Sequence, residues 1–156
     1  MEKIYKPTND IPSFYQPYMD CVPDDGNLIE HLKNIQTETQ QFISGLPEEK
    51  LDYRYSEDKW TIKDIVLHLA DCERVIIYRA MRIARADTTN LPAFDENLFV
   101  INAKAANRKI NDILKELSVF RSATVVFVES LDEESLDRMG TANGYPLSAR
   151  LLVNHI

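Results

Sequence analysis

The histidines are the side chains of this chain best suited to bind a metal ion, and two of the three, His68 and His155, fall on the apolar side of helical segments. His68 belongs to the segment WTIKDIVLHLADCE (60–73), and His155 follows the apolar pair Leu151 and Leu152. Their spacing from apolar neighbours predicts that each imidazole lies on the apolar side of a helix. Neutral imidazole is a ligand for Zn, Ni, Fe and Cu, and helical bundles place such ligands on facing helices. The sequence therefore suggests a metal site between helices.

Two acidic residues follow His68 closely. Asp71 is three residues on and can share its helix face, so it could orient the imidazole or act as a base. The alternative for Asp71 is a solvated helix charge. Glu73 is five residues on, and we expect a solvated charge that pairs with Arg74 or another surface group. We expect His31, on an earlier helix, to be a partly exposed structural residue.

Two arginines fall among apolar helix positions. Arg79 follows Ile76 by three residues, and Arg121 lies between Phe120 and Thr124. Buried arginines need partners, so we expect a salt-bridge network with a neighbouring helix. Recognition of an anion, with either arginine as a substrate anchor, is the second interpretation. Cys72 lies on the same apolar face as His68, and we interpret it as a small buried hydrophobe rather than a nucleophile.

Composition limits the class of protein. A chain of 156 residues is long enough for one domain (1–156) with a hydrophobic core. The net charge of -7 argues against binding to nucleic acid or to an anionic membrane surface. No apolar run reaches the roughly 20 residues of a membrane span, and no signal peptide is evident. Two distant cysteines fit a reduced, cytoplasmic protein. Motifs for phosphate loops, nucleophile elbows and HExxH zinc sites are absent from the sequence.

Apolar periodicity predicts an all-α protein built on three long helices and the start of a fourth. Residues 1–26 hold four of the seven prolines and several aromatic residues, so we expect an arm packed on the domain. The long helices are predicted over residues 28–46, 62–87 and 109–131, with a short helix over 95–105. Predicted inward positions are Leu28, Leu32, Ile35, Phe42 and Leu46; Ile62, Ile65, Leu69, Cys72, Ile76, Ala80 and Ile83; and Ile110, Leu114, Leu117, Phe120, Thr124, Val128 and Leu131.

Helix starts carry recognisable caps. Asn27 and Ser148 are candidate N-caps, and Thr61 with Asp64 resembles a capping box. Another turn of helix is expected at 132–134, and residues 140–146 are expected to form a loop, with no strand anywhere. The segment from Ser148 spans only about 13 Å, against about 35–40 Å for the second and third helices. We expect this fourth helix to be truncated and to continue for roughly four more turns in the natural protein. The alternative is a short helix whose neighbours are covered by another subunit.

These residues together resemble the DinB superfamily of four-helix bundle proteins, in particular its DinB-like, YfiT-like subgroup. The resemblance is carried by LPEEKLDYRYSEDKWTIKDIVLHLADCERVIIYRAMRIARAD, LPAFDEN, LKELSVFRSAT and SLDEESLDRMGTANGYPLSARLLVNHI, in that order. It implies helices running up-down-down-up around a three-histidine metal site. One ligand would match His68, and the others would come from an H-x-x-x-H pair on the fourth helix, where this chain has only His155.

Helix geometry separates the two histidines. If the second and fourth helices run antiparallel, His68 and His155, each about 10 Å from its helix start, should lie toward opposite ends of the bundle. We then expect His155 beside the site or in the core, with the remaining ligands past Ile156.

The resemblance implies a divalent metal, Zn or Ni, with open positions for water or a small-molecule substrate. That arrangement serves hydrolysis, or transfer of a low-molecular-weight thiol to an electrophile. A non-catalytic, stress-related binding or dimerisation bundle with an incomplete metal site is the alternative. A homodimer is plausible for the family.

Overall fold

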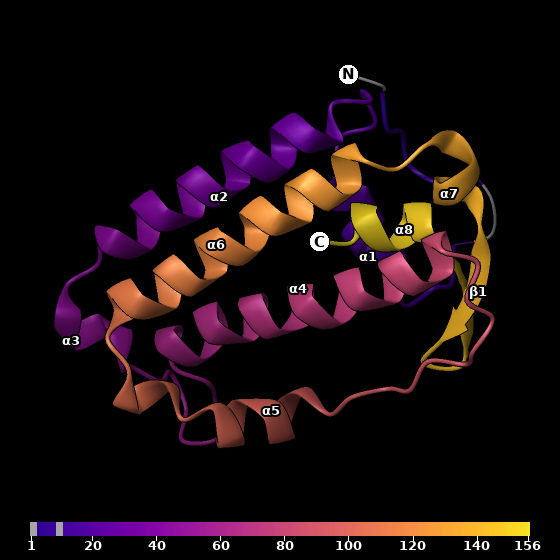
Figure 1. Cartoon of the computed structure of the whole chain (residues 1–156). Coiled ribbons are helices and arrows are strands. Elements are labelled where there is room, and N and C mark those ends of the chain that lie inside the picture. Colours follow the sequence, from indigo (N-terminus) through magenta and orange to yellow (C-terminus); the bar gives the residue numbers. More distant parts are fainter. Residues whose placement is uncertain (1–2, 9–10) are drawn as a thin grey trace.

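The protein is an all-α four-helix bundle in a computed structural model that describes residues 3–8 and 11–156. Its principal helices are α2 (Leu28–Ser44), α4 (Ile62–Ala84), α6 (Ile110–Glu129) and the short α8 (Ala149–Asn154). Figure 1 shows α4 and α6 running in one direction and α2 and α8 in the other. The up-down-down-up order expected from the resemblance is therefore confirmed. No described helix is long and apolar enough to cross a membrane.

Helix α4 is the centre of the bundle and packs against both α6 and α8. Its start is fixed by the predicted capping box, in which the amide of Asp64 donates to Thr61 Oγ1 and the amide of Thr61 donates to Asp64 Oδ2, both at 3.0 Å. The second half of the predicted apolar face is buried, but Ile65 and Leu69 are 44% and 43% exposed. Val66, Leu67 and Ala70 are buried instead, because α6 packs on that side of α4.

Helix α2 packs on α6, and its inward face differs in part from the predicted one. Ile35 and Phe42 are exposed, while Ile29 and Ile43 are buried together with Leu28 and Leu32. Asn27 makes no side-chain cap, contrary to prediction, and its φ of -98° and ψ of 33° lie outside the extended region that N-cap residues adopt. On α6, most predicted inward residues are buried, including Leu114, Leu117, Thr124 and Val128.

A long crossover joins the parallel helices α4 and α6. It contains α5 (Glu96–Ala103) and a 3₁₀ turn, η1 (Ala105–Asn107), where the sequence predicted a short helix. The Asp95 side chain caps α5 by accepting from the amide of Leu98 at 2.9 Å. Another short helix, α3 (Glu48–Leu51), lies between α2 and α4.

The loop expected over residues 140–146 is instead a β-hairpin, so the prediction of no strand was wrong. Strands β1 (Met139–Ala142) and β2 (Tyr145–Ser148) pair antiparallel, with Ala142 opposite Tyr145. The two-residue turn, Asn143 and Gly144, has positive φ at both positions, 53° and 78°. An Asn-Gly pair favours this turn because both residues tolerate the left-handed region. Strand β1 also pairs with Leu91 of the crossover and so ties the two connections together.

The hairpin leads into α8, which is buried along its whole length. The Ser148 Oγ caps α8 as predicted, accepting from the amide of Leu151 at 3.0 Å. Before the hairpin, α7 (Glu133–Asp137) forms the expected turn of helix.

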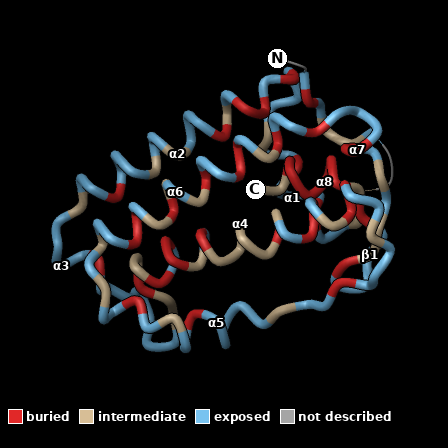
Figure 2. Tube along the Cα trace, viewed as in Figure 1, coloured by how far each residue is buried: buried red, intermediate tan, exposed pale blue. Residues whose placement is uncertain are grey.

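The N-terminal segment packs against α8. It contains α1 (Gln16–Cys21), and its Ile4 and Tyr15 belong to the same buried cluster as Leu151 and Leu152. The Tyr5 carbonyl accepts hydrogen bonds from the α8 side chains Arg150 and Asn154, both at 3.4 Å. In Figure 2 the buried positions follow the facing sides of the long helices and nearly all of α8.

Candidate functional site

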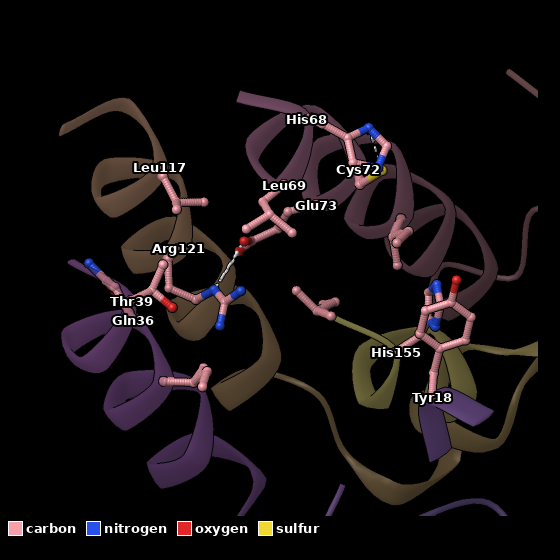
Figure 3. A pocket seen from close by; sticks show the side chains of 13 residues that line it. Tyr18, Gln36, Thr39, His68, Leu69, Cys72, Glu73, Leu117, Arg121 and His155 are labelled. Atoms are coloured by element: carbon pink, nitrogen blue, oxygen red, sulfur yellow. Dashed lines mark hydrogen bonds and ion pairs between the residues drawn. The ribbon is translucent and has the colours of Figure 1, made fainter. Parts of the chain in front are cut away.

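A cavity of about 320 Å³ lies between α1, α2, α4, α6 and the residues that follow α8, and we call it the central cavity (Figure 3). Its apolar lining comprises Ile35, Leu69, Ile76, Leu117 and Ile156. Its polar lining includes Gln36 and Thr39 of α2, Arg121 of α6, and three groups of α4 described below. A mostly apolar cavity of this size with a few convergent polar groups is typical of a small-molecule site.

His68 lines the central cavity from the second turn of α4. Its ring packs against the indole of Trp60, with centroids 4.7 Å apart. Burial lowers the pKa of His68 below its usual 6.5, against the weaker opposing effects of the Glu96 and Asp71 charges. The imidazole is therefore neutral near pH 7, which is the protonation state that binds a metal.

Cys72 lies one helical turn after His68 on the same cavity wall. Its Sγ is 3.2 Å from His68 Nε2. Burial first, and the charges of Glu96 and Asp71 second, raise the pKa of the Cys72 thiol to about 11. Because only the thiolate is a strong nucleophile, this half-buried thiol is unreactive near pH 7, as the sequence indicated.

His155 also lines the central cavity. Its distance from the start of its helix had predicted a position toward the opposite end of the bundle from His68. Figure 3 shows the two rings at different parts of the wall, His68 beside Cys72 and His155 beside Tyr18. The His155 ring meets Tyr15 and Tyr18 edge to face, with centroids 4.9 and 4.4 Å apart. Burial, with the Arg79 charge second, lowers its pKa to about 4. Its Nδ1 is buried and has no hydrogen-bond partner among the described residues.

Glu73 corrects a prediction, because it is a buried ion-pair partner rather than a solvated charge. Its side chain lies in the cavity wall with the whole residue 2% exposed. Arg121 Nε donates to both of its carboxylate oxygens, at 2.9 and 3.0 Å. Glu73 lies on a different side of α4 from His68. Helix α6 packs on that side, so Glu73 faces α6 rather than solvent. The sequence carried no signal for this, since it gives periodicity but not which helices pack together.

Asp71 does not contact His68, and Arg79 does not line the central cavity. Asp71 Oδ1 accepts from Arg74 Nη1 at 3.0 Å, and within the described chain Asp71 makes no hydrogen bond to His68. Arg79 is buried, but its Nη2 donates to the Pro92 carbonyl at 2.6 Å and its guanidinium lies over Phe94. It is not part of the central cavity's lining. Arg79 thus fastens the crossover to α4.

The described side chains do not fit a three-ligand metal centre. Residues 3–8 and 11–156 contain no group of three or more His, Cys, Asp or Glu side chains placed to hold a metal ion. His68 and Cys72 offer one nitrogen and one sulfur donor a turn apart, and His155 offers an imidazole elsewhere on the wall. Two donors at one point fall short of the three protein ligands that open zinc sites have.

A comparison with models of known families identifies the family of this chain. The model of the DinB superfamily matches residues 31–156. The chain belongs to the DinB superfamily. The match covers α4, α6 and α8, so every element that lines the central cavity, apart from α1 and the first part of α2, lies within the DinB region.

Two relatives of this chain share one description. A protein of Oceanobacillus iheyensis named "Putative metal-dependent hydrolase" is 30% identical over 113 residues, 70% of this chain and 64% of that protein. One of Geobacillus kaustophilus with the same description is 26% identical over 123 residues, 76% of this chain and 69% of that protein. The alignments thus span about two thirds of these relatives' own lengths.

A solved structure shares the DinB fold. YfiT from Bacillus subtilis superposes with a TM-score of 0.69 at 17% identity, over 96% of this chain and 82% of that one. It is described as "a probable metal-dependent hydrolase with an unusual four-helix bundle topology". At this identity the likeness concerns the fold alone.

Proposed function

We propose that this protein is a metal-dependent hydrolase of the DinB superfamily that binds a divalent metal at His68 and a small molecule in the central cavity. The observation that carries the proposal is the placement of a neutral imidazole in the wall of a small-molecule cavity. We expect the metal to be Zn or Ni, because imidazole nitrogen coordinates both. Zn also binds sulfur, which Cys72 would offer.

Hydrolysis is favoured over transfer of a low-molecular-weight thiol. Both relatives and YfiT are described as metal-dependent hydrolases. A metal in an open site would supply Lewis acidity and an activated water. The chain's own contribution would be to hold the metal at His68 and to exclude bulk water with the apolar lining.

The test is metal content. The full chain would be loaded with Zn²⁺ or Ni²⁺, dialysed, and examined by elemental analysis and thermal unfolding. We expect retained metal and a raised Tm, both lost in His68→Ala. The matched control is His31→Ala, since His31 lies outside the central cavity and pairs with Asp25. Metal retention that is equal in the two variants would contradict the proposal.

A non-catalytic binding bundle is the second candidate. The missing three-ligand group among the described residues favours it. It predicts no retained metal and an unchanged Tm in His68→Ala, so the same experiment separates the two functions.

A further inference from the structure

The hydrogen bonds of Arg121 leave most of its donors free. A guanidinium has five N–H groups. Both oxygens of Glu73 accept from the single Nε hydrogen, and one Nη1 hydrogen reaches the Leu32 carbonyl at 3.3 Å. The remaining three N–H groups, on Nη1 and Nη2, have no partner within residues 3–8 and 11–156. Arg121 is only 9% exposed as a residue, but its unpaired Nη2 is not sealed off by protein and stays open to a solvent molecule or ligand in the cavity.

Those free donors belong to the wall of the central cavity. Arg121 lines the cavity, and Figure 3 shows its guanidinium reaching from α6 into the space between the helices. Glu73 and the Leu32 carbonyl fix the orientation of the group before any ligand arrives. The Nη1 and Nη2 atoms form a planar edge of parallel donors, the geometry that receives two oxygens of one carboxylate.

We propose that the central cavity takes a small monocarboxylate with an apolar body, whose carboxylate binds the Nη edge of Arg121. Such a ligand satisfies the free donors of Arg121, and its apolar body matches Ile35, Leu69 and Leu117. Glu73 already offsets the positive charge of Arg121. A bound carboxylate therefore leaves the site with one net negative charge and a phosphate dianion leaves it with two, which favours the monoanion over the dianion. The role of this molecule as substrate rests on the proposed function, whereas its binding does not require a metal.

The first experiment needs no variant. Phenylacetate, its neutral analogue phenylacetamide and inorganic phosphate are titrated into the chelator-treated full chain and followed by amide NMR shifts. Phenylacetate should bind about tenfold more tightly than phenylacetamide, since hydrogen bonds to charged groups contribute more than neutral ones, and phosphate should not compete. Equal affinity for the acid and the amide would overturn the proposal.

The second experiment locates the anchor. Arg121→Lys retains the charge opposite Glu73 but removes the planar edge, so phenylacetate should weaken about tenfold and phenylacetamide should not change. Arg79→Lys is the matched control, because Arg79 is equally buried but outside the cavity lining. A loss in Arg79→Lys with none in Arg121→Lys would refute the assignment. Because metal is absent throughout, failure here is distinct from a failure to retain metal at His68.

Discussion

Glu73 of α4 and Arg121 of α6 form a buried ion pair in which one Nε hydrogen serves both carboxylate oxygens, at 2.9 and 3.0 Å. The pair joins the two parallel helices at the wall of the central cavity. It is thus both a structural contact between α4 and α6 and the device that orients the Arg121 guanidinium.

Removal of one partner should destabilise the protein strongly. Glu73→Gln leaves Arg121 as an uncompensated buried charge, which costs about 3–5 kcal/mol, whereas Glu73→Met with Arg121→Met should be nearly neutral. Urea unfolding followed by circular dichroism measures both. The exposed pair Lys33–Glu129 is the control, and Glu129→Gln should cost less than about 1 kcal/mol. Similar costs for Glu73→Gln and Glu129→Gln would show that the buried pair contributes little.

Stability should fall on mild acidification because of His155. Its folded pKa is about 4, below the usual 6.5, through burial first and the facing Arg79 second. Between these values the unfolded chain binds a proton that the folded chain does not, so the free energy of unfolding decreases as pH falls, by up to about 1.4 kcal/mol per unit. The other titratable groups packed on the ring are Tyr15 and Tyr18.

The measurement is unfolding of the chelator-treated chain at pH 7 and pH 5. His155→Phe keeps an aromatic ring against the tyrosines and removes the titration, so the difference between the two pH values should shrink. His31→Gln provides a histidine control outside the central cavity. A pH difference that stays the same in His155→Phe argues against this origin.

Gly140 has no room for a side chain. A Cβ at this position of β1 would lie 2.5 Å from Ile83 Cγ1. Gly140→Ala should therefore destabilise by about 1–3 kcal/mol, as overpacked core sites do. Gly144→Ala is not a suitable control, because its φ of 78° adds backbone strain. In a double-mutant cycle, Gly140→Ala should destabilise the protein less when Ile83→Ala is also present. If the two free-energy changes simply add, the contact between the new Cβ and Ile83 is not the cause.

The capping box should matter for α4 as a whole. Thr61→Ala removes the acceptor of the Asp64 amide and should cost about 1 kcal/mol in thermal or urea unfolding. Thr88→Ala, in the exposed part of the crossover, should change stability by less than about 0.5 kcal/mol. If the two changes cost the same, the cap does not determine where α4 begins.

Periodicity predicted the helices well because each long segment repeats apolar residues at helical spacing and carries local stop and start signals. It could not predict which side of α4 meets α6, so Leu69 was expected to be buried and Glu73 to be solvated. The hairpin was missed although Asn143 and Gly144 are a strong turn signal, because the flanking strands are only four residues long. The joint placement of His68 and His155 on one cavity depends on where α8 lies along α4, which no local pattern specifies.

The contacts between the N-terminal segment and α8 set an order on folding during synthesis. Ile4 and Tyr15 are buried with Leu151 and Leu152, and Tyr5 binds Arg150 and Asn154. These pairs are about as distant in sequence as this chain permits, and a chain emerges from the ribosome with its N-terminal residues first. The earlier segment therefore docks only after the residues of α8 have emerged. Because Tyr18 and His155 lie on that same junction, this wall of the central cavity cannot form before the residues of α8 have emerged.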